Sequence, residues 1–85
     1  MFRDLALLEI KDIFEKGDYF IDDQVLEELE ENHILKTDLK LDSLDIEELT
    51  TALEDKFKIN IPKLEVDDST TVGEIIDYLY EILYE

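Results

Sequence analysis

The segment LDSLDIEEL, residues 41–49, places one of the two serines of this chain just before a run of acidic and apolar residues. At the N-terminus of a helix, unpaired backbone N–H groups and the positive end of the helix dipole favour a phosphate ester on such a hydroxyl. No base lies nearby in sequence to activate Ser43 as a nucleophile. We therefore expect Ser43 to be modified by another enzyme, unless its hydroxyl only caps the helix.

Few other residues suggest catalysis or metal binding. The single histidine, His33, has no cysteine to accompany it, so we expect neither a zinc site nor a catalytic triad. No G-x-x-x-x-G-K-[ST] loop is present to hold a nucleotide phosphate. The run DYFIDDQ lacks the glycine and the spacing of a calcium-binding loop. The expectation is a protein without enzymatic activity of its own and without a metal centre.

The charge balance limits the possible partners. The chain has 25 acidic and 8 basic side chains, which give a formal net charge of −17. This charge repels nucleic acids and anionic membranes, and it attracts basic patches on other proteins. The same charge keeps a small protein soluble, and we expect a monomer.

Length and hydropathy predict one domain, residues 1–85, because there is no linker-like stretch and room for only one modest core. No segment approaches the roughly 20 apolar residues of a membrane span. The N-terminal MFRDLALLEIKD lacks the pattern of a signal peptide. Since the chain has no cysteine for a disulfide, the expected location is the cytoplasm.

Helical periodicity dominates the sequence as a whole. An apolar stripe predicts a helix over residues 2–16 that ends before Gly17. Residues 18–41 are less regular, with DDQVLEELEEN favouring a short helix and HILKTDLKL favouring a loop. The stripe of the first helix comprises Phe2, Leu5, Ala6, Ile10, Ile13 and Phe14. The inward residues of the short helix and the loop are Val25, Leu26, Leu29, Ile34, Leu35 and Leu39.

The clearest helix starts near Ser43, with Asp42 or Ser43 as its N-cap. Pro62 disfavours a helix at Ile61, and KLEVDD then favours a turn or two of helix. Thr71 and Glu74 fit a capping box at the start of the last helix. The inward stripes of these helices comprise Ile46, Leu49, Ala52, Leu53, Phe57, Val72, Ile75, Ile76, Leu79 and Leu83. The prediction is an all-α bundle of three main helices with one or two short ones.

Three segments resemble the acyl carrier protein family. DLKLDSLDIEEL is similar to the family segment DLGxDSLxxxEL, in which the serine carries 4′-phosphopantetheine. ALEDKFKINIP resembles the family's ALEEEFxxxIP at the same distance downstream, and STTVGEIIDYL resembles the start of its last helix. The resemblance is continuous from about Leu35 to Leu83, which is more than half of the chain.

This resemblance implies a discrete carrier rather than an enzyme. A phosphopantetheinyl transferase would attach covalent 4′-phosphopantetheine to Ser43, and the arm would hold acyl groups as thioesters. Fatty-acid, lipid or polyketide-type enzymes with basic patches would load, elongate and transfer these groups. The implied docking surface comprises Asp42, Leu44, Asp45, Glu47, Glu48 and Asp55. The implied acyl-chain pocket comprises Ile46, Leu49, Leu53, Ile75, Ile76 and Leu79.

The sequence departs from the family pattern at several positions. Lys40 replaces the usual glycine, and its ammonium could approach the phosphate of an arm on Ser43. Glu47 and Thr51 stand where many members have apolar residues, and the stretch between Gly17 and Leu35 is longer than usual. These departures suggest a specialised carrier. Two alternatives remain: a carrier of aminoacyl or peptidyl groups, and an acidic helical interaction domain with an unmodified serine.

Overall fold

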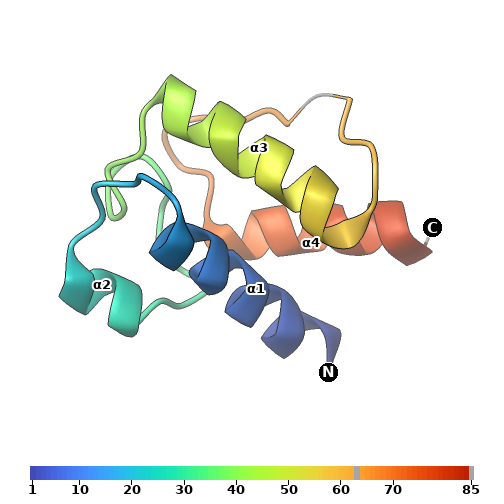
Figure 1. Ribbon diagram of the computed structural model, residues 1–85, viewed down its shortest axis with the longest axis horizontal. Helices are drawn as coiled ribbons and strands as arrows, with labels where there is room; N and C mark the ends of the chain where they lie inside the picture. The colour runs from blue at the N-terminus through green and yellow to red at the C-terminus, as the bar shows by residue number, and fades with distance from the viewer. Residues whose placement is uncertain (63, 85) are drawn as a thin grey trace.

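The computed structural model describes residues 1–62 and 64–84 and shows an arrangement of helices around one core (Figure 1). Its helices are α1 (Phe2–Lys16), α2 (Asp23–Glu27), α3 (Ser43–Phe57) and α4 (Val72–Tyr84). Within these residues the β-structure is limited to one isolated antiparallel bridge between Ile34 and Thr71. The prediction of an all-α bundle with three main helices is confirmed, and one short helix accompanies them.

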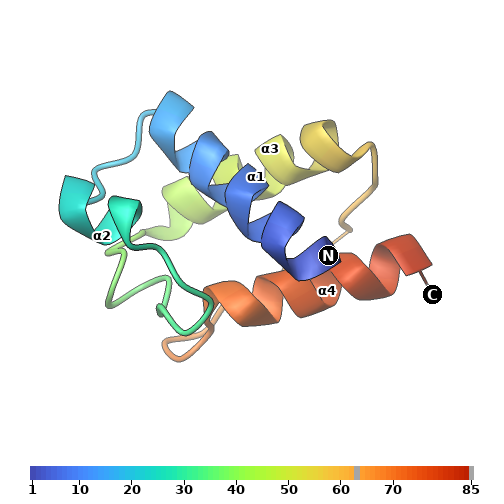
Figure 2. The same cartoon turned by 90° about the horizontal axis from the view of Figure 1, so that it is seen from below.

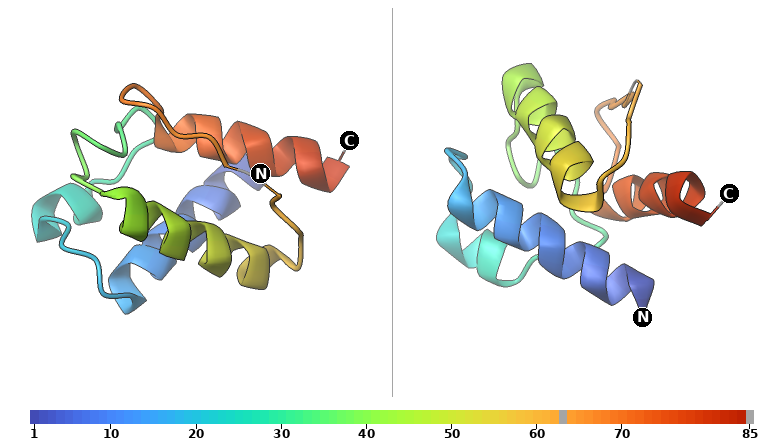
Figure 3. Two further views of the ribbon diagram at one scale, coloured as in Figure 1. Left: turned by 90° about the horizontal axis from the view of Figure 1, so that it is seen from above. Right: turned by 45° about the vertical axis from the view of Figure 1, so that its right-hand side comes forward.

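Helix α1 is the element against which the other helices pack. It contacts α2, α3 and α4, and Figures 2 and 3 show it crossing α3 with its first turn beside α4. The ring of Phe2 lies with its centroid 6.4 Å from that of Phe57 and 5.5 Å from that of Tyr84. The start of α1 therefore meets the ends of both α3 and α4.

The core forms where the apolar stripes of the helices meet. Ala6, Ile10, Ile13 and Phe14 of α1 are buried as predicted, but Leu5 is 56% exposed and does not belong to the core. Successive helical residues are about 100° apart, so the stripe centred on Ala6 and Ile10 turns Leu5 toward solvent. Burial of each large aliphatic side chain contributes about 1.5–3 kcal/mol to stability.

The segment before Ser43 is an ordered connection pinned by leucines. The side chain of Asp22 caps α2 by accepting hydrogen bonds from the backbone N–H groups of Gln24 at 2.9 Å and Val25 at 3.3 Å. The N–H of Leu41 donates to the carbonyl of Leu35 at 3.0 Å. The buried residues here are Leu29, Leu35, Leu39 and Leu41, whereas Val25, Leu26 and Ile34 are partly buried. The predicted short helix and pinned loop are confirmed.

The side chain of Arg3 links α1 to the connection between α2 and α3 and to α4. Arg3 donates to the carboxylates of Glu31 and Asp77 and, at 3.2 Å, to the carbonyl of Gly73. Gly73 in turn donates its N–H to the carbonyl of Glu31 at 2.8 Å. These bonds hold the start of α4 against the connection between α2 and α3.

The segment between α3 and α4 differs from the prediction. Lys63 lies outside the described residues, and residues 64–68 form no helix, so the predicted turn or two in KLEVDD was wrong. The carboxylate of Asp67 accepts hydrogen bonds from the N–H and the hydroxyl of Ser69 and from the hydroxyl of Thr70. Such local side-chain bonds compete with helix formation.

Helix α4 begins with the predicted capping box. The N–H of Thr71 donates to Glu74 Oε1 at 3.0 Å, and the N–H of Glu74 donates to Thr71 Oγ1 at 3.2 Å. Its inward residues Val72, Ile75, Ile76 and Leu79 are buried, while Leu83 is only partly so. No helix in the described part of the chain is both long and apolar enough to cross a bilayer.

Candidate functional site

Asp42, rather than Ser43, is the N-cap of α3. Asp42 Oδ1 accepts a hydrogen bond from the N–H of Asp45 at 2.9 Å, and Asp45 Oδ2 accepts one from the N–H of Asp42 at 3.1 Å. The two aspartates thus form a reciprocal capping box, which satisfies two backbone donors at the helix start. Ser43 follows as the first residue of the helix and is not needed as a cap.

The hydroxyl of Ser43 is exposed and has no hydrogen-bond partner among the described residues. It lies at the positive end of a 15-residue helix, where the dipole stabilises an anion by about 0.3–1 kcal/mol. An exposed, unengaged hydroxyl in this field suits a phosphodiester attached by another protein. The local chemistry of Ser43 therefore fits a phosphopantetheine arm.

Ser69 has a different environment. Its hydroxyl donates to Asp67 Oδ1 at 2.9 Å within the turn before α4. Attachment of a phosphodiester there would break this bond and add a third negative charge to those of Asp67 and Asp68. The two serines are both exposed, and it is hydrogen bonding that distinguishes them.

The predicted docking residues lie on the outer side of α3 and at its start. Leu44 is 61% exposed, and Glu47, Glu48 and Asp55 are exposed on the same helical face. Asp42 is exposed at the cap, whereas Asp45 is half-buried because its carboxylate turns back to the backbone. An apolar side chain beside Ser43 is thus followed by carboxylates along the face.

The far end of this face has mixed charge. Asp55 borders a groove of about 550 Å³ that is also lined by Lys16 of α1 and by Lys56 and Lys58. Hydrogen bonds from Lys56 and then from Lys16 hold the pKa of Asp12 below its ordinary value. Sequence reasoning missed this cluster because its lysines come from different elements, and its local signals were the basic residues Lys16 and Lys56 in the last turns of α1 and α3.

The connection between α1 and α2 lies beside the first turns of α3. The ring of Tyr19 packs edge-on against Phe14 with a centroid separation of 5.1 Å. Burial raises the pKa of the Tyr19 hydroxyl, and the charges of Glu48 and Asp45 raise it further. Sequence reasoning missed Tyr19 as a neighbour of the acidic face because an irregular segment has no periodicity from which to infer its contacts.

Lys40 has the backbone conformation that glycine adopts without strain. Its φ is 57°, in the left-handed region, which costs an ordinary residue roughly 1–2 kcal/mol. This explains why the family pattern has glycine at the corresponding position. The Lys40 side chain is exposed and makes no ion pair with any described residue.

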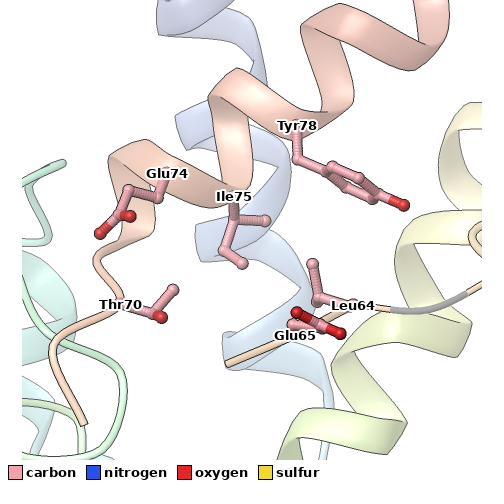
Figure 4. Close-up of a pocket in the computed structure, with 6 residues that line it drawn as sticks. All are labelled: Leu64, Glu65, Thr70, Glu74, Ile75 and Tyr78. Carbon is pink, nitrogen blue, oxygen red and sulfur yellow. The ribbon is translucent and has the colours of Figure 1, made fainter. Parts of the chain in front are cut away.

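The six residues predicted to receive an acyl chain are all buried in one core cluster. Among them, Ile75 borders a cavity of about 320 Å³ between α4 and the preceding segment (Figure 4). The side chains of Leu64 and Ile75 line this space, and Glu65, Thr70, Glu74 and Tyr78 add polar groups. The other five predicted residues do not border this cavity, and their side chains pack as core.

The sequence matches a family model described as a phosphopantetheine attachment site over residues 22–79. It is 45% identical over 53 residues to an acyl carrier protein of Wolinella succinogenes, a match that covers 62% of this chain and 70% of that relative. An acyl carrier protein of Saccharopolyspora erythraea is 29% identical over 79 residues, which is 89% of this chain and 83% of the relative.

Shorter matches are found with mitochondrial relatives. A mitochondrial acyl carrier protein of Saccharomyces cerevisiae is 50% identical over 42 residues, or 49% of this chain and 34% of its own length. A putative mitochondrial acyl carrier protein of Schizosaccharomyces pombe is 48% identical over 42 residues, or 49% of this chain and 38% of its own length. The match to the family model includes the segment around Ser43.

Proposed function

This chain belongs to the acyl carrier protein family, and on that premise we propose that it is a discrete carrier with 4′-phosphopantetheine attached to Ser43. The group, when bound, supplies a flexible arm that ends in a thiol, in a protein that has no cysteine. Acyl groups would travel on it as thioesters between fatty-acid, lipid or polyketide-type enzymes. The names of the relatives favour acyl groups over aminoacyl or peptidyl groups as cargo.

The observation that carries this proposal is the free hydroxyl of Ser43. If the serine were the helix cap, its hydroxyl would be occupied and an unmodified interaction domain would explain the motif equally well. Because Asp42 and Asp45 provide the cap, the serine has no structural duty that accounts for it. Its exposure leaves the oxygen accessible to a phosphopantetheinyl transferase.

Modification of the intact protein tests the proposal. After incubation with coenzyme A and a promiscuous phosphopantetheinyl transferase, the intact mass should increase by one phosphopantetheinyl group. Ser43→Ala should abolish the increase, and the matched control Ser69→Ala should leave it unchanged. Equal labelling of the Ser43→Ala variant, or no labelling of the wild type, would contradict the proposal.

The acidic outer face of α3 is the surface that we assign to the transferase and to the enzymes that load, elongate or transfer acyl groups. Leu44 is its apolar anchor, with Asp42, Asp45, Glu47, Glu48 and Asp55 around it. Basic patches on the partners complement this charge, which should increase the association rate at low salt. The lysines beside Asp55 mark where the acidic character of the face ends.

We propose that the core opens to admit an acyl chain beside Ser43. Dense packing makes a permanent tunnel through Ile46, Leu49 and Leu53 costly, so space must form when cargo enters from between α3 and α4. Each buried methylene contributes about 0.8 kcal/mol, from which the cost of repacking is subtracted. A medium-chain acyl form should therefore melt at a higher temperature than the holo form.

Differential scanning calorimetry measures this acyl-minus-holo difference in Tm. Ile46→Val should lower both melting temperatures through loss of a core methylene, but it should reduce the difference only if Ile46 contacts the chain. An unchanged Tm on acylation of the wild type would mean that the acyl chain stays outside the core.

The cytoplasm remains our proposed location. Two relatives are named as mitochondrial, so the family is also found in that organelle. Fluorescence microscopy of the tagged protein in its own cells decides between the two compartments.

A further inference from the structure

A groove of about 610 Å³ lies between the α1–α2 connection and the segment that leads into α3. The groove is lined on one side by Tyr19, Phe20, Ile21, Asp22 and Val25, and on the other by Asp38, Leu39 and Lys40. The carboxylate of Asp22 is already engaged as the cap of α2. Phe20 is 97% exposed, so its ring has almost no packing partner in the protein. The fold thus leaves an aromatic and aliphatic wall uncovered opposite a lysine.

Two observations place this groove beside Ser43. Lys40 precedes Ser43 by three residues, so their Cα atoms are at most about 11 Å apart. From the other wall, Tyr19 lies close enough to Glu48 and Asp45 of α3 for their charges to raise the pKa of its hydroxyl. A group attached to Ser43 therefore starts within about 11 Å of the Cα of Lys40, which lines the groove.

Lys40 is the cation available to that group. Lys16, Lys36 and Lys56 are paired with aspartates, whereas Lys40 is paired with none of the described residues. The left-handed backbone at Lys40 is costly for any residue with a side chain, yet the position is occupied by lysine. An unpaired lysine is notable in a chain with a net charge of −17.

We propose that this groove is the resting site of the phosphopantetheine arm and that Lys40 is the counter-ion of its phosphodiester. The inference rests on the proposed attachment to Ser43. Along the outer face of α3 the arm would instead meet exposed Glu47, whose charge repels its phosphodiester. The lysines at the other end of α3 are too distant to compete, because Lys56 lies about 20 Å along the helix from Ser43.

The groove also suits the neutral part of the arm. Pantetheine continues from the phosphodiester as a dimethylated, hydroxylated chain with two amides. Its methyl groups match the wall of Phe20 and Ile21, and its amide N–H groups need acceptors. Asp38 Oδ2 accepts from the N–H of Ile34 at 2.7 Å, which leaves Oδ1 for the arm. Tethering at Ser43 makes binding intramolecular, so weak contacts suffice to populate the groove.

Comparison of ¹H–¹⁵N spectra of the apo and holo proteins tests the proposal, with the intact mass first confirming attachment. We expect shift changes at the amides of Tyr19, Phe20 and Ile21, and nuclear Overhauser effects from the arm's methyl groups to Ile21. Changes confined to residues 40–46 would overturn the proposal. Groove shifts that depend on the concentration of apo protein would overturn it too, because the occupant would then be a second copy.

Two matched variants separate a specific counter-ion from a general effect of charge. Lys40 and Lys58 are both exposed, unpaired among the described residues and left-handed, with φ of 57° and 56°. Glycine tolerates this backbone, so both Lys40→Gly and Lys58→Gly should fold. In holo Lys40→Gly the groove shift changes should fall to about half or less, because the bound population loses its counter-ion. They should be unchanged in holo Lys58→Gly.

An equal loss in both variants would show that net charge alone acts, and the proposal would be wrong. Phe20→Ser should also reduce the groove shifts while leaving the increase in mass on modification intact. If no mass is added to the wild type, the proposed function itself fails, and this inference fails with it. If the arm is attached normally but makes no groove contacts, the resting site would be rejected and the proposed function would stand.

Discussion

Asp42 and Ser43 are adjacent residues with separate tasks at the start of α3. The carboxylate of Asp42 satisfies a backbone donor of the helix, and the hydroxyl of Ser43 remains free. A serine in the capping position would have had its oxygen held by the helix. The separation of the two roles allows modification of Ser43 without loss of the cap.

Substitution of Asp42 distinguishes its cap from its charge. Asp42→Asn keeps an oxygen acceptor and should change the free energy of unfolding by only a few tenths of a kcal/mol, whereas Asp42→Ala should cost about 1 kcal/mol. Both remove the negative charge next to Ser43, so both should raise the KM of the transferase for the apo protein. Urea unfolding and initial rates measure the two effects. If Asp42→Asn reacts like the wild type at low salt, Asp42 is a cap and not a docking residue.

Left-handed residues flank α3. Lys40 precedes the capping segment, and Lys58 ends the helix with its N–H donating to the carbonyl of Glu54. Glycine is the usual residue at such a helix end because it has no Cβ. The ends of α3 are therefore defined by backbone geometry that lysine adopts only under strain.

Lys58→Gly should stabilise the protein, by up to about 1.5 kcal/mol. Removal of the left-handed strain contributes about 1–2 kcal/mol, and the greater freedom of glycine in the unfolded chain offsets roughly 0.5–1 kcal/mol of it. The control is Lys56→Gly, two residues earlier within the helix, which should destabilise because it loses helix propensity and the bond to Asp12. Urea unfolding measures both. A destabilised Lys58→Gly variant would show that the Lys58 side chain stabilises the helix end.

The charge of the whole molecule opposes its folding at neutral pH. With 25 acidic and 8 basic residues, the folded chain brings many carboxylates close together, as on the outer face of α3. Added salt screens this repulsion, since the Debye length falls from about 30 Å at 0.01 M to about 8 Å at 0.15 M. We expect the Tm at pH 7 to rise over this range of sodium chloride concentration.

Stability should rise as the pH is lowered from 7 toward 5 and fall again below about 4. Partial protonation of carboxylates first reduces the net charge and its repulsion. The pKa of Asp12 is lowered by Lys56 and then by Lys16, and that of Asp67 by the N–H and hydroxyl of Ser69. Groups with lowered pKa stabilise the fold above their unfolded value of about 3.9, and this contribution is lost as the pH falls through the folded value.

Calorimetric melting temperatures across this pH range check the prediction. The control is Asp67→Asn, which cannot titrate at this position and should show a smaller loss of Tm below pH 4 in its own titration. A Tm that declines steadily from pH 7 to pH 5 would mean that favourable ion pairs outweigh the general repulsion.

The sequence alone was sufficient to predict those features of the structure that are defined within a few residues. The first helix ends where Gly17 follows its apolar stripe, and the last begins at the capping box of Thr71 and Glu74. Such signals are local because helical hydrogen bonds and caps connect residues three or four positions apart. The family motif around Ser43 is equally local, and the family was confirmed by the comparisons.

The tertiary structure decided what depends on contacts between distant residues. Asp42 rather than Ser43 was identified as the cap only from hydrogen-bond geometry, and Leu5 proved exposed because of how α1 lies on its neighbours. The groove between Tyr19 and Lys40 joins two irregular segments about 20 residues apart. Periodicity carries no information on which irregular segments meet, because that depends on how the helices pack around α1. For this reason the sequence alone points to Ser43 as the candidate attachment site, whereas the groove could be found only in the tertiary structure.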